Sequence, residues 1–152
     1  MRKNAKRWLI AGGGVATAAA LGYAGWANRR LFTVNDVTTG ESAAYPHLRS
    51  RVYYAAPDDV LQATEQSIRN LSRWRVVYRD SENDAIEAEA EATLGGFIDD
   101  VTVYVIAVNP RQTRVTIRSR SRIGTGDLGQ NAQHIRELQD AMDSRLTLEA
   151  AL

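Results

Sequence analysis

The sequence contains no cysteine among its 152 residues. A disulfide framework, a thiolate nucleophile and a zinc site built on cysteine are therefore all excluded. Histidine is nearly as scarce, and His47 and His134 are too far apart to have the spacing of metal ligands. We expect both histidines on the surface and predict no metal site.

Acidic residues are missing from the first 30 positions, which hold six of the 19 basic residues. Residues 31–152 contain 13 arginines against 18 aspartates and glutamates, a net charge of −5. A nucleic-acid-binding domain normally carries an excess of basic residues that neutralises phosphates. The charge balance therefore argues against nucleic acid as a partner.

Long hydrophobic runs are also lacking, apart from one uncharged stretch of twenty residues from Trp8 to Ala27. As a helix, at about 1.5 Å per residue, this stretch would be roughly as long as the hydrocarbon core of a bilayer is thick. The heavier basic flank lies before Trp8, which predicts an orientation with the N-terminus inside and the domain outside. We predict that residues 1–30 form a single-pass anchor in a bacterial inner membrane, with the domain in the periplasm. A cleaved signal peptide is the alternative, and it would leave a periplasmic or secreted domain.

The remaining 120 or so residues suffice for one domain with a real core. Residues 31–50 show no sustained hydrophobic period and carry turn residues, which predicts a linker. Residues 51–152 alternate between strand-like and helix-like periods and form the predicted domain. We predict strands at Arg51–Tyr54, Trp74–Arg79, Ile86–Ala92, Val101–Val108 and Arg114–Ile123, and helices at Pro57–Leu71 and Leu128–Leu146.

This order, β-α-β-β-β-β-α, predicts an α+β fold in which an antiparallel sheet of about five strands carries two helices on one face. The strand from Val101 to Val108 is apolar on both faces, which predicts a central position in the sheet. Asp127 and Gln130 resemble a capping box for the last helix, with Asp127 as its N-cap.

Two sets of polar residues could carry chemistry. Arg118, Arg120 and Arg122 share one face of their strand, so some of them could bind an anionic ligand or pair with a neighbouring carboxylate. Asp99 and Asp100 are adjacent in an extended segment, so their side chains point to opposite faces of the sheet. We therefore expect one of them to pair with an arginine and the other to be solvated, rather than both to bind one ligand.

A glycine pattern at residues 124–129 matches the G-x-G-x-x-G of dinucleotide-binding proteins. The helix that follows is the last element, however, whereas a Rossmann unit needs a further parallel strand. Asp127 would also place a negative charge where the pyrophosphate should lie. We therefore predict no dinucleotide and no other cofactor.

Three compound motifs resemble the family known as domain of unknown function 1499. They are Phe97-Ile98-Asp99-Asp100, then Arg118-Ser119-Arg120-Ser121-Arg122-Ile123-Gly124, then Asp127-Leu128-Gly129-Gln130-Asn131. The resemblance covers roughly residues 36–148 and implies a small domain associated with a cell envelope or an organelle. It implies no established reaction, and Gln133 and His134 stand where the resemblance leads us to expect basic residues.

Two hypotheses for the function follow. The first is a membrane-tethered interaction or ligand-binding module of the cell envelope, whose partner is an anionic small molecule, lipid or protein. The second is a hydrolase-like or metal-dependent enzyme that uses Asp99, Asp100 or Asp127 with Arg118 or Arg122. We favour the first because no nucleophile and base occur as a set. The candidate ligand-binding residues are Arg118, Arg120, Arg122, Asp99, Asp100, Asp127 and Asn131.

Overall fold

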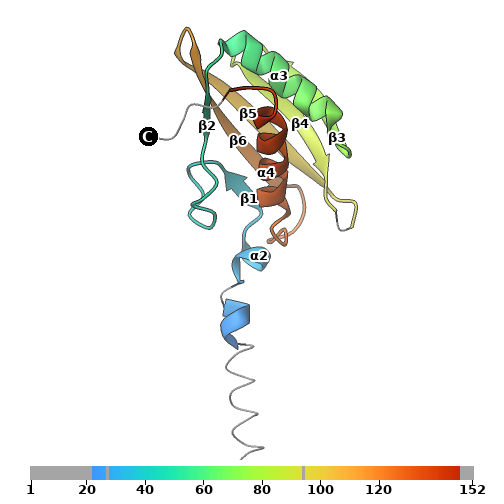
Figure 1. The fold of residues 1–152 in the computed structure, drawn as a ribbon. Helices are drawn as coiled ribbons and strands as arrows, with labels where there is room; N and C mark the ends of the chain where they lie inside the picture. Colours follow the sequence, from blue (N-terminus) through green and yellow to red (C-terminus); the bar gives the residue numbers. More distant parts are fainter. Residues whose placement is uncertain (1–21, 27, 94, 148–152) are drawn as a thin grey trace, which may run out of the picture.

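The computed structural model describes residues 22–26, 28–93 and 95–147 (Figure 1). Its elements in chain order are α2 (Arg30–Thr33), β1 (Asp36–Thr38), β2 (Arg51–Tyr53), α3 (Pro57–Asn70), β3 (Trp74–Asp80), β4 (Ala85–Glu91), β5 (Ile98–Asn109), β6 (Gln112–Ser121) and α4 (Gln130–Asp143).

The strands form one antiparallel sheet in the order β1-β6-β5-β4-β3, and β2 pairs with β6 farther along the edge that β1 occupies. The last four strands are a meander, since each pairs with the next one in the chain. The predicted α+β class and antiparallel sheet are confirmed. The sheet has six strands rather than about five, because β1 was not predicted.

The two long helices form as their sequences predict. In α3, Pro57 occupies the first turn and Asp58 and Asp59 lie at the positive end of the helix dipole. Its buried residues recur at helical spacing, as do those of α4. Helix α4 begins at Gln130 rather than Leu128, and Leu128 is exposed instead of contributing to the buried stripe.

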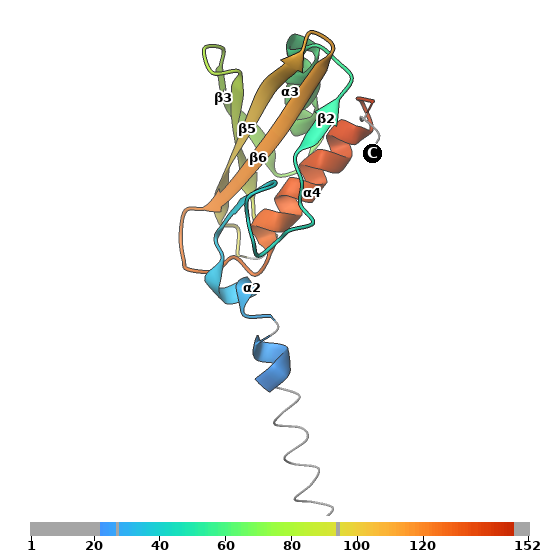
Figure 2. The same ribbon diagram turned by 90° about the vertical axis from the view of Figure 1, so that its left-hand side faces the viewer.

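Both helices cover the same face of the sheet, so the domain has two layers (Figure 2). The core between the layers is a continuous apolar cluster. Its central strand, β5, contributes Val101, Val103 and Val105. The central position of β5 is confirmed, but its outer side is not buried, because Tyr104, Ile106 and Val108 are exposed there.

The segment predicted as a linker, residues 31–50, belongs to the domain. Residues Asp36 to Thr38 pair with β6 as strand β1, and Val37, Tyr45 and Leu48 are buried in the core. A strand of three residues with one inward-facing side chain leaves no periodic signal in the sequence. The prediction of a linker was therefore wrong.

The start of the domain is held against the connection between β6 and α4. The amide groups of Asp127 and Leu128 donate hydrogen bonds to the carbonyl groups of Val34 and Leu31, at 3.2 and 2.8 Å. A Cβ atom on Gly126 would lie 2.2 Å from the backbone of Phe32, so only glycine allows this close approach. Helix α2 is therefore docked on the domain rather than loosely connected to it.

Within the described ranges, no helix combines the length and the apolar character that crossing a membrane requires. Most of the predicted anchor, Trp8 to Ala27, lies outside those ranges; residues 22–26 are helical.

Candidate functional site

Two loops and a helix start meet at the end of the domain where α2 lies (Figures 1 and 2). The described residues of these loops are 92–93 and 95–97, between β4 and β5, and 122–129, between β6 and α4. Between them lies a pocket of about 650 Å³. Its lining residues are Ala92, Thr93, Gly95, Phe97, Asp99, Ser121, Ile123, Gly124, Gly126, Asp127, Leu128, Gln130 and Gln133.

The polar side of this pocket is built by two residues that pair across neighbouring strands. Asp99 of β5 is in register with Ser121 of β6, and both face the helices. Asp99 is only 2% exposed. The Ser121 hydroxyl hydrogen bonds the Asp99 carboxylate and accepts a hydrogen bond of 2.9 Å from the Asn131 amide. The strand pairing therefore places a carboxylate at the sheet end of the pocket.

Asn131 connects three parts of the fold and is completely buried. Its side-chain oxygen accepts a 2.6 Å hydrogen bond from Ser119. Its amide nitrogen donates to Ser121 and, at 3.0 Å, to the Asn35 carbonyl oxygen. Asn131 was a candidate ligand-binding residue, but its amide is committed to holding α4 against β6 and the residue before β1.

Asp99 lies beside His134 of α4, whose side chain is also buried. The Asp99 Oδ2 and His134 Nδ1 atoms are 3.4 Å apart but lack hydrogen-bond geometry, and neither atom has another partner among the described residues. Burial raises the pKa of the Asp99 carboxyl, and burial lowers the pKa of His134 although the charge of Asp99 opposes that shift. Both shifts favour the neutral forms. The expectation that His134 is a surface residue was wrong.

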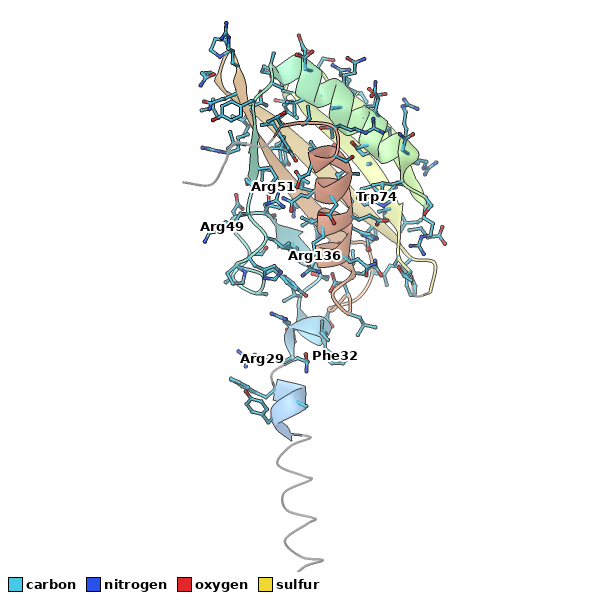
Figure 3. The ribbon with its side chains drawn as sticks, in the orientation of Figure 1. Arg29, Phe32, Arg49, Arg51, Trp74 and Arg136 are labelled. Atoms are coloured by element: carbon cyan, nitrogen blue, oxygen red, sulfur yellow. The ribbon has the colours of Figure 1, made fainter. Side chains whose placement is uncertain are left out.

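The His134 ring is held in place from two further sides. Trp74 of β3 packs edge-on against it, with ring centroids 5.5 Å apart. Its Nε2 atom lies 3.2 Å from the side-chain nitrogen of Gln130. Figure 3 shows Trp74 beside α4. The sequence contained one signal for this burial, because His134 shares its helical face with Asn131 and Leu138.

Asp127 caps α4, although not through the predicted capping box. Its two carboxylate oxygens accept hydrogen bonds from the backbone N–H groups of Gly129 and Asn131, at 2.8 and 2.7 Å. The N-cap residue itself is Gly129. Gln130 does not reach back to the cap, because its side-chain oxygen accepts the Thr93 N–H across the pocket. The positive end of the α4 dipole is thus already occupied by a carboxylate of the same chain.

Three large apolar side chains surround the pocket opening. Phe97, Ile123 and Leu128 are 56%, 71% and 55% exposed. They come from both loops, and all three line the pocket. The opening is therefore apolar, in contrast to the buried carboxylate at the sheet.

The arginine candidates lie on the other face of the sheet, away from this pocket. Arg122 pairs with Asp100 and Glu89, at 2.6 Å each, so it contacts carboxylates of two neighbouring strands, β5 and β4. Glu89 also pairs with Arg75, and both arginines lower the pKa of Glu89. Arg122 reaches Glu89 across β5 because it lies just beyond the end of β6.

Arg118 is engaged as well, in an ion pair with Asp36 of β1 at 2.5 Å. Its guanidinium lowers the pKa of Asp36. Arg120 is exposed, lies opposite Asp36 in the register, and has no ion pair within 4 Å in the part of the chain that the structure describes. Of the predicted candidates, Asp99 and Asp127 line the pocket and Asn131 is buried between α4 and β6. The others, Arg118, Arg120, Arg122 and Asp100, lie on the open face.

No group of three or more histidine, aspartate or glutamate side chains within residues 22–26, 28–93 and 95–147 is placed to hold a metal ion. The glycine loop before α4 serves packing and capping: Gly126 allows the approach of α2, and Gly129 adopts a left-handed conformation with φ of 84°. What the site offers chemically is a buried hydrogen-bonding carboxylate beneath an apolar opening.

We predict that Asp127→Ala lowers the free energy of unfolding by about 1–2 kcal/mol, because two backbone donors at the start of α4 lose their acceptor. Urea unfolding followed by circular dichroism measures this change. Asp140→Ala, an exposed acid in the second half of the same helix, should leave stability nearly unchanged. An unchanged unfolding midpoint for Asp127→Ala would show that the carboxylate is not a structural cap.

We further predict that the His134 imidazole titrates below its ordinary pKa of 6.5. The unfolded chain then binds more protons than the folded one just below pH 6.5, so this histidine makes stability fall as the pH falls through that region. Asp99→Asn removes a charge that supports protonation and should lower the pKa of His134 further. Imidazole NMR titration of the wild type and of the variant measures the pKa of His134 in each. A His134 resonance that titrates at or above 6.5, or that ignores the substitution, would contradict this assignment.

Comparisons with known proteins complete the description of the site. No curated protein matches the sequence. Among solved structures, the di-domain aromatase/cyclase StfQ of steffimycin biosynthesis is similar, with 11% identity and a TM-score of 0.48 over 62% of this chain and 43% of that one. This chain thus spans less than half of that protein's length.

Two further solved structures resemble the domain over more of their own length. They are a START superfamily protein from Mycobacterium smegmatis (10% identity, 74% of this chain, 97% of that chain, TM-score 0.45) and norcoclaurine synthase from Thalictrum flavum (8%, 77%, 88%, 0.44). At these scores, none of the three supports a ligand or a reaction for this chain.

A family model is more decisive, because it matches residues 29–142, which include the pocket, both loops and the buried Asp99, Asn131 and His134. The three motifs quoted above lie apart in the sequence, but together they contribute eight of the residues that line the pocket: Phe97, Asp99, Ser121, Ile123, Gly124, Asp127, Leu128 and Gln130. The chain belongs to the family described as protein of unknown function DUF1499.

Proposed function

We propose that this domain is a binding module for a small amphipathic molecule, which occupies the pocket at the start of α4. The observation that carries the proposal is the Oδ2 atom of Asp99. Asp99 lines the pocket, and this buried oxygen has no hydrogen-bond partner among the described residues. A buried acceptor without a partner is costly, and a donor group on a ligand would satisfy it.

The apolar opening fits the other part of such a ligand. A hydrocarbon body between Phe97, Ile123 and Leu128 would remove exposed apolar surface from water, worth about 25 cal/mol for each Å² buried. The pocket volume of about 650 Å³ is within the range of small-molecule sites, roughly 300–1,000 Å³. The proposed ligand thus has an apolar body and a hydrogen-bond donor at one end.

The charges at the pocket favour a neutral or cationic ligand over an anionic one. Its charged lining residues, Asp99 and Asp127, are both acids. Two arginines are nearby but do not line the pocket. Arg73 donates a hydrogen bond to the Thr93 hydroxyl, and Arg122 donates to the carboxylates of Asp100 and Glu89. The helix N-terminus, which could attract an anion, is already capped by Asp127.

Anion binding by the arginine face remains a separate prediction. Arg118 and Arg122 would have to leave their carboxylate partners to bind an anion, whereas Arg120 is exposed. The enzyme hypothesis needs an aspartate and an arginine at one site. Asp100, Arg118 and Arg122, however, lie on the opposite face of the sheet from Asp99 and Asp127. We accordingly favour binding over catalysis.

We also propose that residues 8–27 tether the protein to a membrane and that the domain lies on the outer, periplasmic side. The support is the uncharged stretch with its heavier basic flank at the N-terminal side. A cleaved segment would leave the same binding domain free in the periplasm.

A displacement assay tests the binding proposal. The probe is N-phenyl-1-naphthylamine, an apolar fluorophore with one N–H donor, and the competitors are decanol, decylamine and decanoate at pH 7.5. We expect the probe to bind, and the alcohol and the amine to displace it better than the carboxylate. Asp99→Asn should reduce the preference for decylamine over decanoate, because it removes the acidic group at the ligand's polar end.

Two charged variants locate the binding site. Ile123→Glu places a carboxylate at the pocket opening and should weaken probe binding by about fivefold or more, since contact with a large apolar side chain is worth roughly 1–2 kcal/mol. Val108→Glu alters an equally apolar, exposed residue far from the pocket and should leave binding unchanged. Equal effects of the two variants, or preference for decanoate, would refute the proposal.

A further inference from the structure

We propose that the pocket end of the domain rests on the lipid surface, so that the pocket opens onto the bilayer rather than into bulk water. The contact surface is an apolar rim formed by Phe32, Phe97, Ile123 and Leu128. The inference rests on the tether proposed above. It does not depend on which ligand the pocket holds.

The rim residues are exposed and belong to one end of the molecule. Phe32 is 61% exposed and lies on α2, at the base of the domain in Figure 3. Its backbone approaches Gly126, which lines the same pocket as the other three rim residues. Single exposed apolar residues are ordinary, but three large ones around one opening, with Phe32 next to it, indicate an interaction surface.

The connection to the uncharged segment is too short to hold this end away from a membrane. Leu31 is fixed to the domain, because its carbonyl oxygen accepts the Leu128 N–H at 2.8 Å. Ala27, where the uncharged segment ends, is only four positions before Leu31 in the chain. Fully extended, four residues reach about 14 Å. The Leu128 backbone therefore lies within about that distance, plus one hydrogen bond, of the end of the segment.

That reach matches the depth of a bilayer interface. The polar headgroup layer adds roughly 5–8 Å on each side of the hydrocarbon core, and amphipathic surfaces bury their apolar side chains about 5–10 Å into this boundary. If the segment ends at the edge of the hydrocarbon core, the rim is within range of the headgroups. A flexible linker of twenty residues would impose no such restriction, but residues 36–48 are built into the domain.

The residues next to the segment have the composition of a membrane interface. Tyr23 and Trp26 are exposed, and the Arg29 guanidinium stacks over the Trp26 ring at 4.9 Å. Arg30 stacks over Tyr45 at 5.2 Å and donates to the Ala44 carbonyl oxygen, which fixes it to the domain. Aromatic rings and arginines of this kind favour the headgroup region of anionic membranes.

Two other exposed apolar residues of the folded domain provide a matched comparison. Ile106 and Val108 are 50% and 48% exposed, but they lie on the open face of β5 toward its far end. They are as apolar as the rim residues and have no short connection to the uncharged segment. If exposure alone decided membrane contact, both groups of residues would contact the bilayer. The proposal predicts contact for the rim residues only.

The test uses the full chain, reconstituted into vesicles of phosphatidylcholine and phosphatidylglycerol at 3:1. Because the sequence has no cysteine, single spin labels can be attached at Phe97→Cys, Ile123→Cys, Val108→Cys and, at the opposite hairpin, Ser81→Cys. Collision rates with oxygen and with a water-soluble nickel chelate report the depth of each label. We expect labels at positions 97 and 123 to lie about 5–10 Å below the phosphates, and labels at 108 and 81 to be fully aqueous.

Aqueous values at positions 97 and 123 would overturn the proposal, as would a chain that does not associate with the vesicles. Equal immersion at position 108 would also overturn it, because the bilayer would then contact apolar surface without regard to the rim. Probe displacement, measured separately in detergent, shows whether the pocket binds its ligand. A failure of membrane contact is therefore distinguishable from a failure of ligand binding.

Discussion

The site depends on the buried amide of Asn131. A fully buried asparagine must satisfy both its oxygen and its nitrogen within the protein, and the hydrogen bonds that do so here join α4, β6 and the residue before β1. That junction fixes the start of α4 above the end of β6. The two loops, the docked α2 and the pocket between them follow from that position.

The two faces of the sheet carry different sets of polar residues. Because side chains alternate along β5 and β6, successive residues of these strands lie on opposite faces. Toward the helices, Asp99, Ser119 and Ser121 form a buried polar group that ends at His134. Toward solvent, Asp100, Arg118 and Arg122 form ion pairs that are exposed and so contribute little to stability. Adjacent residues of one motif therefore serve the pocket and the surface separately.

The periodicity of apolar residues predicted most of the fold, because it is clear in α3, in α4 and in the four strands of the meander. It missed β1, whose three residues have one buried side chain. The predicted capping box was also wrong for Gln130, whose side chain accepts the Thr93 N–H instead. The motif residues were recognised in the sequence, but not that Phe97, Asp99 and Ser121 share a pocket. Their proximity arises from strand register and loop closure, which no local pattern contains. His134 was misplaced because a histidine in a polar stretch of helix carries a weak burial signal.

Native-state hydrogen exchange of Asn131→Ala tests the central claim most directly. If Asn131 holds the start of α4 on β6, the amides of Gln133 and Ser121 should open more easily than in the wild type, by about 1–3 kcal/mol. Both lie at this junction, since they donate to the Gly129 and Asn35 carbonyl oxygens. The amides between β3 and β4 should lose much less protection. A uniform loss across the sheet, or unchanged exchange at Gln133 and Ser121, would contradict the account.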